Sequence, residues 1–233
     1  MKEEGNISEA YSKATQSSRL TGDMIEEAQK LLEAMGLPYI VAESEGEAQA
    51  AYMTAQDQVY AVGSQDWDCL LFGADTMVRN LTSRKTRKTS GGGRKEVSTE
   101  KIVLEDVLDQ LGITHEELQW LGILVGTDFN PDGIYGIGPK TALDLVKQYN
   151  NFEDLMSDEK VEWESDNSPE AILEFFQDPP VEDVDFEFKS PDNDKIRTLL
   201  VEEHEFSQKR VDSGLEKLST ALESRQSGLD SFT

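Results

Sequence analysis

Five acidic side chains lie at spacings that could build a metal site. Glu45 and Glu47 open the stretch EGEAQAAYM, Asp66 and Asp68 follow the apolar stretch VYAVG, and Asp128 follows LQWLGILVG. Carboxylate oxygens are hard ligands, and a ligand set without His or Cys favours Mg²⁺ or Mn²⁺ over Zn²⁺. The pattern therefore predicts a divalent metal site built from carboxylates.

Each acidic pair also has a purely structural explanation. Asp66 and Asp68 could be the polar residues of the turn that ends a strand. Ser44 and Glu47 have the spacing of a capping box, in which both side chains bond free amides of the first helical turn. A capping box leaves Glu45 unexplained, and neighbouring carboxylates repel one another unless a cation neutralises them.

The segments around these residues alternate between strand and helix patterns. LPYIVA (37–42) has the pattern of a short buried strand, residues 43–56 that of a helix, and VYAVGS (59–64) that of a second buried strand. Such alternation predicts βαβ units and a parallel sheet, in which ligand sites form at the carboxyl ends of the strands. Both acidic pairs would lie at that edge.

Helical periodicity dominates the remainder of the chain. It covers residues 8–35, 101–111, 115–125, 139–149, 168–180 and 194–223, whereas 224–233 has a turn-like composition. We therefore expect an α/β fold, with a mostly parallel sheet flanked by helices, then a helical region and a flexible C-terminal tail.

A glycine-rich turn, GIYGIGPK, joins two of the predicted helices. Gly136 and Gly138 permit a tight turn and a close backbone approach, and a helix that begins with proline presents free amides to an anion. Lys140 adds a charge that can reach a phosphate. The pattern predicts sequence-independent phosphate binding, and an ordinary helix-turn-helix connection is the alternative.

Charge is unevenly distributed. The chain carries 47 acidic and 22 basic residues, a net charge of −25, which taken alone argues against binding a polyanion. The segment from Arg79 to Lys95 nevertheless holds seven Lys and Arg and no acidic residue. It is either a solvated hairpin loop or a phosphate-contacting patch, with Arg94 and Lys95 among the candidate contacts.

Other features limit the class of protein. One cysteine, Cys69, excludes an internal disulfide and fits a reducing compartment. The chain has no apolar stretch of membrane-spanning length, so we expect a cytoplasmic protein without a membrane partner. His115 and His204 lack the neighbours of a metal site, and Trp67 is expected to pack rather than to stack on a base. A Rossmann-type nucleotide binder is disfavoured because no G-x-G-x-x-G follows a strand.

Four motifs in order, SEGEAQAAYM, GSQDWDCLLFG, ILVGTDFN and GIGPK, resemble the flap endonucleases of the XPG type, the archaeal branch most closely. The resemblance runs through nearly the whole chain and implies a PIN-like nuclease core. It implies a Mg²⁺-dependent, structure-specific 5′ flap endonuclease, with 5′–3′ exonuclease activity, acting in DNA replication and repair. Two Mg²⁺ ions, for which Mn²⁺ can substitute, would be bound by Glu45, Glu47, Asp66, Asp68 and Asp128.

The resemblance also assigns partners. The turn of Gly136, Gly138 and Lys140 matches a helix-two-turn-helix that holds branched or flapped duplex DNA, with a K⁺ ion between loop carbonyls and a phosphate. The tail QSGLDSFT resembles the box that docks on the replication sliding clamp, with Gln226, Leu229 and Phe232 at the anchor positions. Thr233 stands where the family usually has a second aromatic residue, so weaker clamp binding is expected. A tail without a partner is the alternative.

By resemblance the chain divides into four parts. Residues 1–36 match part of a helical arch and the following helix, 37–125 the C-terminal part of the nuclease core, 126–222 the helix-two-turn-helix and a helical appendage, and 223–233 the clamp-binding tail. The family pattern starts with roughly a hundred further residues that hold two more metal-binding aspartates. We therefore expect that the chain cleaves a 5′ flap little or not at all by itself. We also expect a monomer. The alternative function is a DNA- and clamp-binding module.

Overall fold

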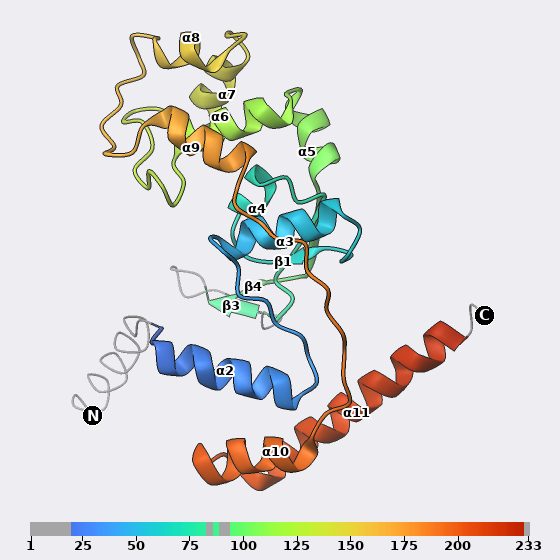
Figure 1. Ribbon diagram of the computed structural model, residues 1–233. Coiled ribbons are helices and arrows are strands. Elements are labelled where there is room, and N and C mark those ends of the chain that lie inside the picture. Colours follow the sequence, from blue (N-terminus) through green and yellow to red (C-terminus); the bar gives the residue numbers. More distant parts are fainter. Residues whose placement is uncertain (1–19, 83–85, 89–93, 231–233) are drawn as a thin grey trace. The chain divides into compact units, whose positions relative to one another are not determined.

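The computed structural model describes residues 20–82, 86–88 and 94–230. The chain forms two compact units. Unit 1 combines Met1–Ile40 with Val184–Thr233, and unit 2 is the continuous segment Val41–Asp183 (Figure 1). The units cut across the four parts expected from the sequence, whose assignments stay predictions.

Unit 2 contains a small mixed sheet. Its strands are β1 (Val62–Gly63), β2 (Thr76–Arg79) and β5 (Glu100–Val103), in the order β1-β2-β5. β1 pairs parallel to β2 and β2 pairs antiparallel to β5. The connection from β1 to β2 passes through the short helix α4 (Asp68–Leu71), so the residues after β1 lie at the carboxyl edge of a parallel pair, as predicted.

The predicted strand at 37–42 is wrong. Residues 37–42 have no regular structure, and Val41 is 72% exposed. A strand forms only where a neighbouring backbone accepts its hydrogen bonds, and no described segment pairs with these residues. The apolar composition of LPYIVA therefore does not correspond to a buried strand.

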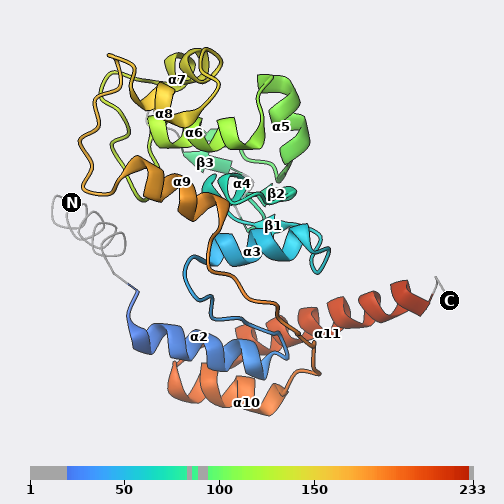
Figure 2. The same ribbon diagram turned by 45° about the horizontal axis from the view of Figure 1, so that its top comes forward.

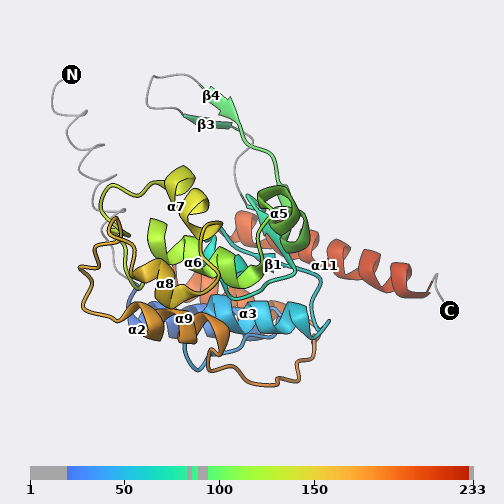
Figure 3. The ribbon, with the colours of Figure 1, turned by 90° about the horizontal axis from the view of Figure 1, so that it is seen from above.

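A hairpin carries part of the basic segment. Strands β3 (Thr86–Lys88) and β4 (Arg94–Glu96) pair antiparallel, with Arg87 opposite Lys95 and Lys88 opposite Arg94. Figure 3 shows this hairpin extending away from the three-stranded sheet. The backbone thus supports a hairpin here, as the sequence indicated.

The described part of unit 2 also contains the helices α3 (Gly46–Ala55), α5 (Leu104–Leu111), α6 (His115–Val125), α7 (Pro139–Val146), α8 (Phe152–Met156) and α9 (Pro169–Gln177). Local signals fix the end of α5 and the start of α6. Gly112 ends α5 in the left-handed region, and Thr114 with Glu117 forms a capping box at the start of α6. Helices α7 and α9 pack against α6 (Figure 2). Ile123 and Leu124 of α6 are fully buried there.

Unit 1 is helical in its described part. It contains α2 (Gly22–Ala34), α10 (Asn193–Arg197), the π-helix η1 (Thr198–Glu203) and α11 (Gln208–Asp230). Ala34, Ile196, Val211 and Leu215 form its small core. The turn-like composition of 224–233 was misleading, since the backbone of α11 continues to Asp230. Among the described residues, no helix is long and apolar enough to cross a bilayer.

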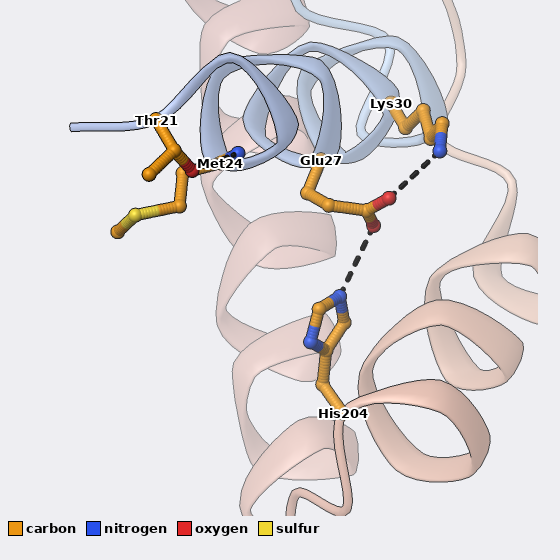
Figure 4. Close-up of polar contacts among 5 residues, drawn as sticks. All are labelled: Thr21, Met24, Glu27, Lys30 and His204. Atoms are coloured by element: carbon orange, nitrogen blue, oxygen red, sulfur yellow. Dashed lines mark hydrogen bonds and ion pairs between the residues drawn. The ribbon is translucent and has the colours of Figure 1, made fainter.

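A polar contact joins α2 to the segment after η1. Glu27 accepts a hydrogen bond from Lys30 at 2.7 Å and contacts His204 Nε2 at 3.1 Å, as Figure 4 shows. The hydrogen bond from Lys30, followed by that from His204, lowers the pKa of the Glu27 carboxyl. His204 therefore pairs with a carboxylate of unit 1, consistent with its predicted surface position.

Candidate functional site

Asp66 and Asp68 lie in the turn that joins β1 to α4. The amide of Asp66 donates to Ser64 Oγ at 3.1 Å, and the amide of Asp68 donates to Asp66 Oδ1 at 3.1 Å. Asp66 therefore does have the turn role that was the structural alternative. One of its carboxylate oxygens nevertheless takes no part in that bond, so the turn does not exclude a ligand role.

Asp68 has the most strongly perturbed carboxyl of the described residues. Burial, followed by the charge of Asp66, raises its pKa from 3.8 to about 6, and Asp128 and Glu47 add to the rise. A hydrogen bond from the backbone of Asp128 acts in the opposite direction. Four of the five predicted ligands thus share one electrostatic environment.

The two glutamates lie at the start of α3. Glu45 is the N-cap residue, but its side chain makes no capping hydrogen bond, and it is exposed whereas Glu47 is half-buried. The capping box proposed for Ser44 and Glu47 does not form. The main charges that raise the pKa of Asp68 are those of Asp66, Asp128 and Glu47, and Glu45 is not among them.

The loop that carries Asp128 is fixed from within. Thr127 and Asn130 are buried; the Thr127 hydroxyl donates to Asn130 Oδ1 at 2.7 Å, and Asn130 Nδ2 donates to the carbonyl of Ile123 at 2.7 Å. The hydroxyl of Thr127 also accepts the amide of Phe129 at 3.2 Å. These bonds hold the backbone on both sides of the exposed Asp128.

One aromatic cluster positions both aspartate segments. Phe72, at the end of α4, lies 4.8 Å from Phe176 between ring centroids, and Phe129, next to Asp128, lies 5.0 Å from Phe175. Both pairs have the tilted or edge-on geometry that aromatic rings prefer. Because Phe175 and Phe176 belong to α9, this helix sets the distance between the α4 and Asp128 segments.

Two polar side chains of α6 bond the last carbonyls of α4. His115 Nε2 lies 2.8 Å from the carbonyl oxygen of Leu70, and Gln119 Nε2 donates to that of Leu71 at 2.9 Å. The ends of a helix leave such carbonyls without partners, so these contacts stabilise a helix of only four residues. His115 thus has a structural role at the end of α4.

Side chains of α3, among them a buried amide, anchor this helix to the segment that follows α9. Gln49 donates to the carbonyl of Glu182 at 2.8 Å and accepts its amide at 3.0 Å, while the hydroxyl of Tyr52 donates to Asp183 at 2.6 Å. The sequence offered no signal for these partners, because they lie about 130 residues away in the chain. They fix the helix that carries Glu47.

Cys69 belongs to the core and not to the ligand set. It is fully buried, and burial raises the pKa of its thiol from 9.0 to about 11. A protonated thiol is a poor metal ligand, so the donor set consists of carboxylates, as expected for Mg²⁺. The chemistry of these donors fits the metal, but in the described residues no group of three His, Cys, Asp or Glu is arranged to hold an ion.

The predicted phosphate-binding turn lies between α6 and α7. Gly136 has a φ of 79°, Gly138 is the N-cap of α7, and Pro139 occupies the first turn of that helix without any capping side chain. A Cβ at Gly136 or Gly138 would meet nothing within 4 Å. Lys140 is exposed at the same helix end. The turn therefore leaves open space and helix amides beside a lysine.

The other predicted contacts are described less fully. Arg94 and Lys95 belong to the backbone of β4, and Gln226 and Leu229 to that of the last turns of α11. Phe232 lies outside the described residues. Trp67 is 50% exposed, and the guanidinium of Arg79 lies 4.3 Å from the centroid of its ring. The expectation that Trp67 packs rather than stacks on a base stays a prediction.

An acidic groove borders the turn. It is lined by Asn130, Pro131, Asp132, Gly133, Tyr135, Glu162, Glu164, Ser165 and Asp166. Asn167 secures one wall by donating to the carbonyl of Phe129 at 2.9 Å. The groove therefore places four carboxylates next to a turn that is predicted to bind a polyanion.

Comparisons with known proteins agree with the residue pattern. Residues 36–128 match the XPG I-region. The chain is 47% identical to flap endonuclease 1 of Aeropyrum pernix over 98% of its length, and spans 67% of that relative. It also matches the structure of flap endonuclease-1 from Methanococcus jannaschii with a TM-score of 0.76 and 37% identity, covering 95% of this chain and 65% of the other.

A more distant structure shows the fold alone. The catalytic core of Rad2 in complex with DNA substrate matches with a TM-score of 0.71 at 22% identity, over 90% of this chain and 74% of that one. The PIN-type nuclease fold expected from the sequence is thus confirmed. Flap endonucleases are nucleases, which hydrolyse ester bonds. The 47% identity to flap endonuclease 1 of Aeropyrum pernix, over 98% of the chain, shows that the protein belongs to the flap endonuclease family and resembles its archaeal members.

Proposed function

We propose that the chain acts in a Mg²⁺-dependent, structure-specific 5′ flap endonuclease, with 5′–3′ exonuclease activity, in DNA replication and repair. The observation that supports this proposal is that the charges of Glu47, Asp66 and Asp128 all raise the pKa of Asp68, in a chain that shares 47% identity with flap endonuclease 1 of Aeropyrum pernix. The chain spans 67% of that relative, so the activity of the relative is proposed for this chain and not transferred as a fact.

The carboxylates would hold two Mg²⁺ ions, or Mn²⁺ in their place. Bound there, the ions would activate a water molecule and stabilise the leaving oxygen at phosphorus. Glu47, Asp66, Asp68 and Asp128 would supply the negative charge that binds them, and Glu45 would join by rotation of its exposed side chain. Because the pKa of Asp68 is raised to about 6, below that pH its carboxyl group must lose a proton before it binds a cation.

The turn at Gly136 and Gly138 would hold the DNA duplex. Open space at both glycines lets a phosphate approach the backbone, the first turn of α7 offers amides, and Lys140 adds a positive charge. A K⁺ ion between loop carbonyls and a phosphate would fit the same turn. Arg94 and Lys95 of the hairpin would add further phosphate contacts. Such binding reads DNA shape and carries little sequence information.

A cleavage assay tests the nuclease proposal. Because the chain alone is expected to cleave little or not at all, it is used in excess over a labelled 5′-flap oligonucleotide. Any Mg²⁺-dependent cleavage at the flap junction should be lost in Asp68→Asn and retained in Asp144→Asn, which replaces an exposed aspartate of α7. Cleavage that persists in Asp68→Asn would refute the assignment of the site. Duplex binding without any cleavage would instead favour the DNA- and clamp-binding module.

A salt titration tests the duplex contact. Loss of one phosphate contact reduces the slope of log affinity against log salt by about one. Lys140→Glu should show this reduction, and Lys217→Glu in α11 serves as the matched charge change in unit 1. An unchanged slope in Lys140→Glu would remove Lys140 from the contacts.

The clamp proposal rests on Gln226, Leu229 and Phe232. A large aromatic side chain is the kind of residue that dominates an interface. Phe232→Ala should therefore weaken binding to a sliding clamp, measured by surface plasmon resonance, more than Ser231→Ala does. Equal affinity of both variants would show that the tail is not the docking element. A monomeric state and a cytoplasmic location stay predictions.

A further inference from the structure

Arg79 contacts the residues on both sides of Asp66. Its guanidinium carbon lies 4.3 Å from the centroid of the Trp67 ring, and its Nη2 donates to the carbonyl of Gln65 at 3.2 Å. Asp66 in turn accepts the amide of Asp68 at 3.1 Å. A continuous series of contacts thus runs from Arg79 to both aspartates of the turn.

The sheet register explains how Arg79 reaches this turn. In the parallel pair, Val62 lies opposite Met77 and Gly63 opposite Val78. Arg79 is the last residue of β2 and therefore lies beside the first residues that follow β1. The same register that places the aspartates at the carboxyl edge of the sheet also places this arginine there.

The position of Arg79 has no evident cause in core packing. Trp67 remains 50% exposed under the guanidinium, and the Nε of Arg79 is buried without a hydrogen-bond partner among the described residues. No ion pair of the described residues involves Arg79. A solvent-exposed arginine would keep a hydrogen bond from Nε to water. The observed position of Arg79 therefore costs the free energy of that hydrogen bond while its guanidinium holds the turn.

We infer that Arg79 is a positioning residue of the acidic site. By holding the Gln65 carbonyl and the Trp67 ring, it fixes the backbone at Asp66 and, through Asp66, the amide of Asp68. The Asp66 carboxylate is then held on the backbone amide of Asp68 before a divalent cation binds. This inference rests on the proposed function, because it assigns a role in forming the proposed metal site.

The replacement by lysine separates two parts of this role. Arginine offers a planar group that stacks on an aromatic ring and donates sideways to a carbonyl, whereas lysine offers a compact charge. Arg79→Met removes both the charge and the donor, and Arg79→Lys keeps the charge and one donor. The matched control is Lys101→Met, because Lys101 also lies over an aromatic ring, at 5.1 Å from the centroid of Tyr60, on the neighbouring strand β5.

The experiment is a calorimetric titration of each variant with Mn²⁺ alone, combined with the indole N–H signals in a two-dimensional NMR spectrum. Loss of a residue that orients metal ligands typically lowers metal affinity by about 10-fold or more. We expect this loss in Arg79→Met, partial recovery in Arg79→Lys and no change in Lys101→Met. The indole signal of Trp67, assigned through Trp67→Phe, should shift in Arg79→Met before metal is added.

Two outcomes are decisive in different ways. If the unsubstituted chain binds Mn²⁺, and Asp68→Asn does not, then unchanged affinity in a folded Arg79→Met overturns the inference and leaves the proposed function intact. If the unsubstituted chain binds no Mn²⁺, the proposed metal site fails and the inference fails with it. Circular dichroism establishes that each variant is folded, and Arg79→Lys provides the comparison if Arg79→Met does not fold.

Discussion

Gln49 and Glu182, 133 residues apart in the sequence, exchange two hydrogen bonds. The side-chain amide of Gln49 bonds both the carbonyl and the amide of the Glu182 backbone, as the backbone of a neighbouring strand would. Since Gln49 is only 4% exposed, these bonds form at the edge of the core. They join the helix that carries Glu47 to the segment that follows α9.

Gln49→Leu should therefore destabilise unit 2. The substitution leaves both backbone groups of Glu182 without protein partners, and loss of such bonds costs about 1 kcal/mol. Urea unfolding measures the effect, and amide hydrogen exchange at Glu182 should become faster. Gln110→Leu, at an exposed position of α5, is the matched control. Equal effects of the two substitutions would contradict this role for Gln49.

The raised pKa of Asp68 predicts a pH-dependent gain in stability for Asp68→Asn. The folded state holds the Asp68 proton up to about pH 6, whereas the unfolded chain releases it near 3.8. Stability of the unsubstituted chain from this group therefore falls as pH rises between those values. Asn carries no charge, so the variant should be more stable by about 2 kcal/mol above pH 6.5 and equal near pH 4.

Chemical unfolding in EDTA at pH 4.5 and pH 7.5 measures this difference. Asp144→Asn, which removes an exposed charge of α7, should show no comparable change between the two pH values. A gain for Asp68→Asn that is the same at both pH values would show that repulsion and burial at Asp68 are not its cause.

Three glycines near the turn should respond differently to alanine. Gly133 has a φ of 58°, and a Cβ there would collide with the backbone carbonyl of Val125. Gly136 has a φ of 79° with open space, and Gly138 has an ordinary φ of −89° with open space. Gly133→Ala should cost the most stability, Gly136→Ala about 1 to 2 kcal/mol, and Gly138→Ala almost none.

DNA binding separates these variants further. Gly138→Ala should fold normally but weaken duplex binding, because its methyl group occupies the space in front of the α7 amides. Thermal unfolding and fluorescence anisotropy on the same samples test both statements. Unimpaired duplex binding by Gly138→Ala would argue against phosphate contact at this helix end.

The acidic groove should reduce affinity for DNA. Unit charges 10 Å apart in water interact by about 0.4 kcal/mol, so each neutralised carboxylate should raise duplex affinity by about twofold at low salt. Glu162→Gln with Glu164→Gln removes two charges beside Tyr135, and Glu105→Gln with Glu116→Gln is the control pair. The gain should shrink as salt is added. A gain that is independent of salt would indicate a change in structure instead.

Local signals in the sequence predicted much of the fold. Helical periodicity predicted a helix at residues 115–125, and α6 spans His115–Val125 with Thr114 and Gly126 at its ends. The strand expected at 37–42 failed because apolar composition does not reveal whether a pairing partner exists. The capping box at Ser44 failed for a related reason, since the correct spacing does not fix the side-chain rotamers.

The residues proposed for the site can be named from the sequence, and their role as metal ligands stays a prediction. The carboxylates are proposed because their residue types and positions after apolar segments are visible along the chain. Their supports could not be named, because His115, Gln119 and Gln49 reach carbonyls 45, 48 and 133 residues away. Ordinary polar residues of this kind give no local signal of the backbone that they will bond.

Unit 1 is built from two segments that are far apart in the sequence, and this affects the order in which the units can fold during synthesis. Its core joins Ala34 to Val211 and Leu215, so the packing cannot form until Val211 and Leu215 have left the ribosome. Unit 2 is continuous and can fold while synthesis proceeds. Until Val211 and Leu215 have emerged, Ala34, at the end of α2, lacks these core partners.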